Sequence, residues 1–238
     1  MRPENLYRVV GTIVCLLMCA SGVPSLAADD DAVTSPLALA LGTAAINDSS
    51  ASDYRYRLDY QSLTIKVHAE VDPQAPDGER LEILDSEVAE SEKAERLDTV
   101  IADIERGAAQ GYWCSALLKS VPADASLLSQ TAQLATYEFD PIPTGDRNDD
   151  FLENLVGEVS IDPQTGVVRS FRLRAPKPFR QALIARITEF ELNTECQPAP
   201  DGRYFASDFR MHIRGSAAFR DFEDEVVRRL TILRTPGQ

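Results

Sequence analysis

Residues 157–175 read GEVSIDPQTGVVRSFRLRA, and this stretch decides the fold class. Apolar residues alternate with polar ones on both sides of Asp-Pro-Gln-Thr-Gly. Such alternation is typical of a strand with one buried face, and Pro and Gly between two such runs indicate a turn. The stretch therefore predicts a β-hairpin with one apolar face. The side chains expected on that face are Val159, Ile161, Val167, Phe171 and Leu173.

The same alternation recurs on both sides of this hairpin. It is found in YRYRLDY (54–60), SLTIKVHAEVD (62–72), LATYEFDP (134–141), LIARITEFELNTEC (183–196) and RYFASDFRMHIRG (203–215). The connections are short and mostly of the hairpin type, which favours an antiparallel sheet of sequential neighbours. We expect FEDEVVRRLTIL (222–233) to close the sheet.

One segment has the spacing of a helix. In residues 91–106 the apolar side chains recur every three or four positions, and Gly107 can end the helix. Its apolar stripe needs a surface to cover. The sequence thus predicts an α+β fold that is mainly antiparallel β, with a curved incomplete barrel or half-barrel sheet wrapped around one main helix.

Residues 1–27 have the features of a cleavable signal peptide. Arg2 and Arg8 precede a short apolar run, and small residues near Ala27 suit a cleavage site. The apolar run is too short to span a bilayer. Cys19 raises the alternative of a lipidated cysteine, although large apolar residues precede it. We expect an exported, periplasmic protein without stable membrane insertion.

The rest of the chain is predicted to contain a single domain. Residues 28–53 are expected to form a weakly ordered N-terminal arm or a short helix, and residues 54–238 a single β domain. The formal net charge of −14 argues against nucleic acid as a partner, because phosphate binding needs a basic surface. The sequence leaves the oligomeric state undetermined.

Cys114 and Cys196 are the two cysteines that follow the predicted signal peptide. In an oxidising compartment two such cysteines most often pair, so we expect a structural disulfide. The alternative is a reactive thiol, which needs a neighbouring base or a second cysteine two residues away. Neither sequence position has such a neighbour.

Six basic residues fall within RSFRLRAPKPFRQALIAR (169–186) of this acidic chain. Folding this stretch as a hairpin brings Arg172 and Arg174 opposite Glu189 and Glu191 on the outer face, as cross-strand charge pairs. Exposed pairs of this kind contribute only about 0.2 to 1 kcal/mol each. Two basic residues of the turn keep a positive excess that would suit an acidic partner: Lys177 and Arg180.

The opposite, apolar face is rich in aromatic side chains, and one helix is available to cover it. If the sheet encloses more space than the helix fills, an apolar groove remains for an acyl chain or lipidated partner. If loops and the N-terminal arm fill that space, no ligand site remains. The sequence leaves both alternatives open. The residues predicted to line the groove are Tyr54, Tyr56, Tyr60, Tyr137, Phe139, Phe171, Leu173, Phe190, Leu192, Phe209 and Met211.

Motifs for catalysis or metal binding are not found in the sequence. It contains no Gly-x-Ser-x-Gly, His-Glu-x-x-His, Cys-x-x-Cys or Gly-Lys-Ser/Thr segment. His68 and His212 fall on the polar side of their strands. A hydrolase that uses paired carboxylates would need them buried together, which sequence does not reveal. We predict no catalytic residue, no metal and no cofactor.

The layout resembles the periplasmic lipoprotein-localisation carriers of the LolA/LolB-like type. The resemblance rests on YRYRLDY and LTIKVHAEV after the signal peptide, and on FLENLVGEVSIDPQTGVVRSFRLRAPKPF followed by IARITEFEL. It implies an incomplete antiparallel barrel that wraps around helices and holds lipid acyl chains. The expected function is therefore a non-enzymatic carrier of a lipid or acylated protein. The alternative is an exported structural or adaptor protein with a fully packed sheet.

Overall fold

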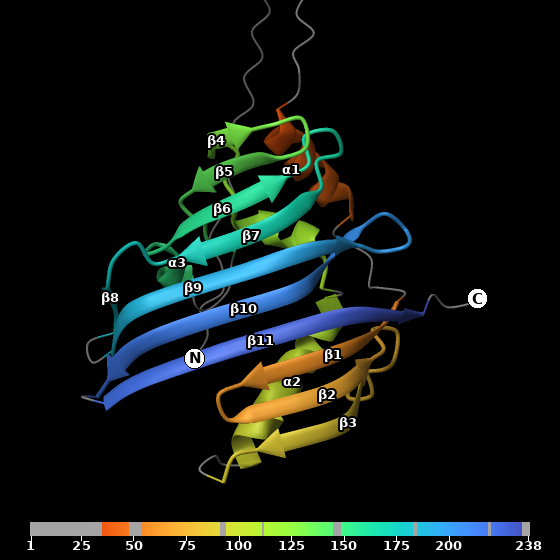
Figure 1. Ribbon diagram of the computed structural model, residues 1–238, viewed down its shortest axis with the longest axis vertical. Coiled ribbons are helices and arrows are strands. Elements are labelled where there is room, and N and C mark those ends of the chain that lie inside the picture. Colours follow the sequence, from red (N-terminus) through yellow and green to blue (C-terminus); the bar gives the residue numbers. More distant parts are fainter. Residues whose placement is uncertain are drawn as a thin grey trace, which may run out of the picture. The chain divides into compact units, whose positions relative to one another are not determined.

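The computed structural model describes residues 35–47, 54–90, 94–110, 112–144, 149–182, 185–218 and 220–234. Eleven strands in this part of the chain form one antiparallel sheet (Figure 1). The strands are β1 (Arg55–Ser62), β2 (Ile65–Val71), β3 (Leu81–Val88), β4 (Ser126–Gln130), β5 (Ala135–Phe139), β6 (Val156–Ile161), β7 (Val168–Arg174), β8 (Phe179–Ala182), β9 (Ala185–Pro198), β10 (Tyr204–Ala217) and β11 (Arg220–Arg234). The helical elements are α1 (Pro36–Asn47), α2 (Ala94–Gln110), the 3-10 helix η1 (Cys114–Ser120) and α3 (Asp149–Leu152).

The strand order is β3-β2-β1-β11-β10-β9-β7-β6-β5-β4, and β8 pairs with β9 beside this path. Most neighbours are consecutive in the sequence, as the short connections predict. The main exception is the pairing of β1 with β11, which joins the first and the last strand. Consecutive β3 and β4 lie at opposite edges of the sheet, so the segment that holds α2 and η1 crosses it (Figure 1). The predicted antiparallel sheet is thus confirmed, and it is open.

Two apolar cores lie between the sheet and its helices. We name the first the α1 core, because Leu37 and Ala40 of α1 pack there with η1 and with β5, β6, β7 and β9. The second is the α2 core, where Ile104 and Ala108 of α2 pack against β1 and β2. Figure 1 shows α1, α2 and η1 behind the sheet. The helical cover is therefore divided among several elements and is not one main helix.

The N-terminal segment differs in part from the expectation of a weakly ordered arm. Residues 36–47 form α1, and Leu37 is 2% exposed. The short-helix alternative is correct here, because one face of this apolar segment packs into the α1 core through Leu37, Ala40, Leu41 and Ala44. The predicted signal peptide and Cys19 lie outside the described residues.

The hairpin of β6 and β7 is confirmed, with one change of side-chain orientation. The pairing register shifts between Ser160 and Ile161, so that Ile161 pairs with Val168. As a result Val168 is buried in the α1 core, whereas Val167, which we expected there, is only partly buried. An irregular step of this kind reverses the facing of a side chain, and strict alternation does not reveal it.

Candidate functional site

A row of direct cross-strand partners crosses the whole sheet. Because such partners share one face, the row shows which side chains lie on the same face of the sheet as the helices. Val67 in this row belongs to the α2 core and Val159 to the α1 core, so both cores lie on the same face. From β3 to β4 the row contains Ser86, Val67, Tyr60, Arg228, Phe209, Thr194, Phe171, Val159, Tyr137 and Leu127.

All eleven residues predicted to line a groove belong to the helix-covered side, but they fall into two groups. Those packed inside the two cores are Tyr54, Tyr56, Tyr137, Phe139, Phe171, Leu173 and Phe190. Their burial favours a structural role, because protein atoms already fill the space around them. The less covered ones are Tyr60, Leu192, Phe209 and Met211.

Two of these less covered residues, Phe209 and Met211, lie on β10 in the middle of the sheet, where β10 pairs with β11. Phe209 and Val226 belong to neither core. Met211 and Ile213 pack only against the margin of the α1 core and stay partly exposed. We call this surface the central strip, and its six partly exposed members are Phe209, Met211 and Ile213 of β10 and Asp224, Val226 and Arg228 of β11.

Charges mark the two ends of the central strip. At one end the carboxylate of Asp224 accepts a hydrogen bond from Arg96 of α2, at 3.0 Å between Nη2 and Oδ2. At the other end lies Arg228, four residues further along β11. At about 3.3 Å per residue, the strip is about 13 Å long between the Cα atoms of these two residues. Between the charges the strip is apolar.

Arg228 is a cation on the apolar face of the sheet. The guanidinium carbon lies 4.9 Å from the ring centroid of Tyr112 and 4.8 Å from that of Phe209. The Nε atom is buried, and the described residues offer it no hydrogen-bond acceptor. Burial lowers the pKa of the guanidinium, which the polar Tyr112 and Tyr60 only partly offset. No carboxylate of the described chain neutralises this charge.

A second polar group of the same face lacks a partner. Thr194 is 1% exposed, and its hydroxyl makes no hydrogen bond within the described part of the chain. It is the direct cross-strand partner of Phe209 on β9, as Arg228 is on β11. Two unsatisfied polar groups therefore lie on either side of Phe209. Buried groups of this kind cost stability unless something satisfies them.

Our sequence reasoning missed Arg228, although the sequence carries a signal for it. In β11 the residues at even positions from Val226 to Ile232 are apolar except for Arg228, which is expected to share their face. An arginine within an apolar register of a strand indicates a buried charge, and such charges are often functional. Thr194 is a similar case on β9, because its polar hydroxyl lies in the same register as the apolar Phe190 and Leu192.

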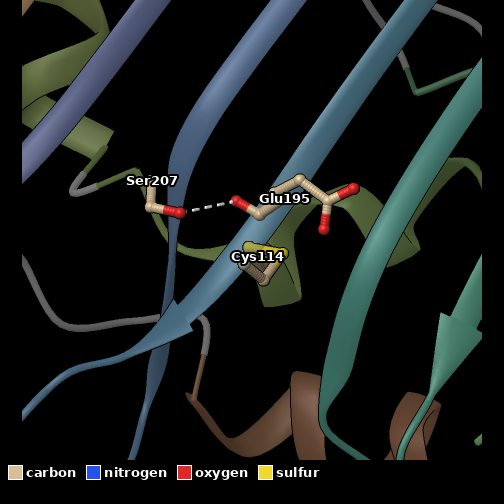
Figure 2. Close-up of a disulfide and its surroundings, with 4 residues drawn as sticks. Cys114, Glu195 and Ser207 are labelled. Carbon is tan, nitrogen blue, oxygen red and sulfur yellow. Dashed lines mark hydrogen bonds between the residues drawn. A yellow bond between two sulfur atoms is a disulfide. The ribbon is translucent and has the colours of Figure 1, made fainter.

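The predicted disulfide is present between Cys114 and Cys196, with a Cα–Cα distance of 6.3 Å. Figure 2 shows Cys114 on η1, beside β9. Next to it the hydroxyl of Ser207 on β10 donates a hydrogen bond to the carbonyl oxygen of Glu195, at 3.2 Å. The bridge thus attaches η1 to β9, on the covered face of the sheet.

The outer face carries a network of ion pairs. Arg172 pairs with Glu191 at 2.9 Å, as the hairpin predicts. Arg174 instead lies between Glu138 of β5 and Glu158 of β6, at 3.6 and 3.7 Å. Glutamates of neighbouring strands thus match Arg172 and Arg174, and Arg169 pairs with Asp162 at 2.8 Å. The hydrogen bond of Asn193 and the charge of Arg172 lower the pKa of Glu191.

The described residues contain little that would favour catalysis. His68 lies 2.7 Å from Asp59 and His212 lies 3.0 Å from Glu223, and both pairs are solvent-exposed on the outer face. Among the described residues no three His, Cys, Asp or Glu side chains are placed to hold a metal. In the same part of the chain, no helix is long and apolar enough to cross a membrane.

The chain was compared with known proteins by sequence and by structure. No family model, no curated protein and no solved structure matches it.

Proposed function

We propose that this protein is an exported, non-enzymatic carrier that binds a lipid or an acylated partner along the central strip. The observation that supports the proposal is the partly exposed apolar surface between the two cores, on the face that carries the helices. Ligand sites are mostly apolar, with a few placed polar groups, and the strip has this composition. In this proposal the sheet curves as a half-barrel, as the resemblance to LolA/LolB-like carriers implies.

The proposal includes export to the periplasm. Its support is the predicted signal peptide, together with the Cys114–Cys196 bridge, which is compatible with an oxidising compartment. The bridge would also serve the carrier, because it attaches η1 to β9 and keeps the α1 core closed beside the strip.

The second candidate is an exported structural or adaptor protein without a ligand. It is favoured by the seven predicted groove residues that are packed inside the cores. In that case only the surface of the protein makes functional contacts. The two candidates differ in whether the central strip takes up an apolar molecule.

A binding experiment separates them. The protein, purified from a periplasmic extract, is examined by native mass spectrometry for bound lipid and titrated with N-phenylnaphthylamine, a neutral dye that fluoresces in apolar sites. The carrier proposal expects saturable dye binding, or lipid that co-purifies in a fixed ratio. Absence of both would reject it in favour of the adaptor.

Two variants of β11 locate the site. Val226→Arg adds a charge in the central strip, whereas Val227→Arg adds the same charge one residue away, on the opposite face beside Arg210. The proposal expects Val226→Arg to weaken dye binding at least about tenfold, because a cation in an apolar contact loses hydration. Val227→Arg should bind as the wild type does. Equal loss in both variants would place the binding elsewhere.

A further inference from the structure

A purely apolar ligand would not explain why the central strip contains the positive charge of Arg228. It is mostly covered, its Nε lacks an acceptor among the described residues, and two aromatic rings lie against it. Aromatic rings attract a guanidinium but satisfy none of its five N–H donors as a carboxylate does. A buried cation of this kind is costly unless it is paired.

The charged residues next to Arg228 already have ion-pair partners. Asp224, the acidic residue of the strip, pairs with Arg96 at the opposite end. On the outer face, Arg229 pairs with Asp208 at 3.2 Å, so this adjacent arginine also has a carboxylate. Within the described chain, Arg228 therefore differs from Arg229 in lacking an anion, although it is the more buried of the two.

We propose that Arg228 binds the terminal carboxylate of a long-chain fatty acid whose alkyl chain lies along the central strip. This inference rests on the proposed carrier function and names its ligand class. The guanidinium presents a planar fork of donors that matches a carboxylate with two parallel hydrogen bonds. The chain would then extend from Arg228 past Val226 and Met211.

The charge balance favours a carboxylate over a phosphate. A phosphate monoester carries about −1.5 to −2 at neutral pH, so a single guanidinium would leave part of its charge unpaired in an apolar setting. A phosphodiester has one charge, but it carries substituents on two sides, whereas the strip has its free cation at one end only. A terminal carboxylate ends its chain and has a single charge.

The test compares ligands that share one alkyl chain. Palmitate, cetyl alcohol and cetyl phosphate compete with N-phenylnaphthylamine for the wild-type protein. Palmitate is expected to bind at least about tenfold more tightly than cetyl alcohol, because a charge-assisted pair adds to the same apolar contact. In Arg228→Met, the affinity for palmitate should fall to that for cetyl alcohol, whose own affinity stays unchanged. In Arg229→Met, the preference for palmitate should remain.

Each other outcome has a defined meaning. If the wild type binds palmitate and cetyl alcohol equally, or if Arg228→Met keeps the preference, the carboxylate site is rejected while the carrier function stands. If cetyl phosphate binds most tightly, the carboxylate assignment is wrong. If the dye does not bind saturably and no lipid co-purifies, both proposals fail. Thermal unfolding checks that Arg228→Met folds; should it not, Arg228→Lys replaces it and is expected to lower the preference several-fold.

Discussion

Arg228 of β11 and Phe209 of β10 are direct cross-strand partners, and the guanidinium carbon of Arg228 lies 4.8 Å from the centroid of the Phe209 ring. The pair occupies the gap between the α1 core and the α2 core. Neither residue belongs to either apolar core. Departures from simple apolar packing are expected at functional sites, where stability is given up for binding.

The disulfide should make a large contribution to stability. It joins residues separated by 82 positions, for which loop-closure entropy gives about 4.5 kcal/mol. We expect the double variant Cys114→Ala/Cys196→Ala to lose about 2 to 5 kcal/mol of unfolding free energy in urea titration. Dithiothreitol should destabilise the wild type by a similar amount and leave the double variant unaffected. An unchanged midpoint in the double variant would contradict this prediction.

The strands were the most predictable part of the fold. Alternation of apolar and polar residues locates β1, β2 and β5 to β7 within a few positions, because each has one buried face. The predicted orientation of the Val167 side chain was wrong, because a register irregularity depends on the partner strand. The pairing of β1 with β11 involves residues far apart in the chain, so local pattern does not reveal it.

The candidate site was less predictable than the fold. The sequence showed which aromatic residues share the covered face, but not which of them the helices cover. Tyr56 and Phe209 look alike in their strands, yet Tyr56 is fully buried against Phe205 and Tyr112, and Phe209 is partly exposed. The difference depends on where α2 and η1 cross the sheet, which is a tertiary property. Arg228 was recognisable in principle, from its register in β11.

Two glycines should respond in opposite ways to alanine. Gly157 pairs with Phe139 across β5 and β6, and a Cβ atom at Gly157 would overlap the Phe139 ring. We expect Gly157→Ala to cost about 1 to 3 kcal/mol in unfolding free energy. Gly42 lies on the exposed side of α1 with open space around it, so Gly42→Ala should stabilise by up to about 1 kcal/mol. Shifts in the same direction would argue against this packing.

Asp162 should make stability depend on pH in the acid range. Its carboxylate accepts a hydrogen bond from Arg169 at 2.8 Å and others from the backbone N–H groups of Gln164 and Thr165. These contacts, that of Arg169 foremost, lower the pKa of Asp162 in the folded state. The stabilisation is therefore present above the unfolded pKa of about 3.9 and is lost as the pH falls through the folded pKa.

Asp162→Asn tests this dependence, because asparagine keeps an oxygen acceptor for the turn but loses the ion pair with Arg169. Unfolding free energies of both proteins are measured between pH 2 and pH 7. The wild type should be more stable at pH 5 to 7, and the difference should shrink below about pH 4. A difference that stays constant across this range would show that the charge of Asp162 adds nothing.

Tyr112 offers a complementary test at alkaline pH, close to Arg228. Its hydroxyl donates a hydrogen bond to the carbonyl oxygen of Ile104 in α2, at 2.8 Å, and burial raises the pKa of Tyr112 to about 12. Tyr112→Phe removes a buried hydrogen bond and should cost about 0.5 to 1.5 kcal/mol at neutral pH.

Above pH 10 the unfolded chain releases the tyrosine proton while the folded chain keeps it, so wild-type stability falls until about pH 12. The phenylalanine variant lacks this loss, so the two curves should converge above pH 10 and cross before about pH 12. Tyr54 and Tyr60 titrate in both proteins, so the difference between the curves isolates Tyr112. Parallel curves in that range would mean that the Tyr112 hydroxyl is accessible to solvent.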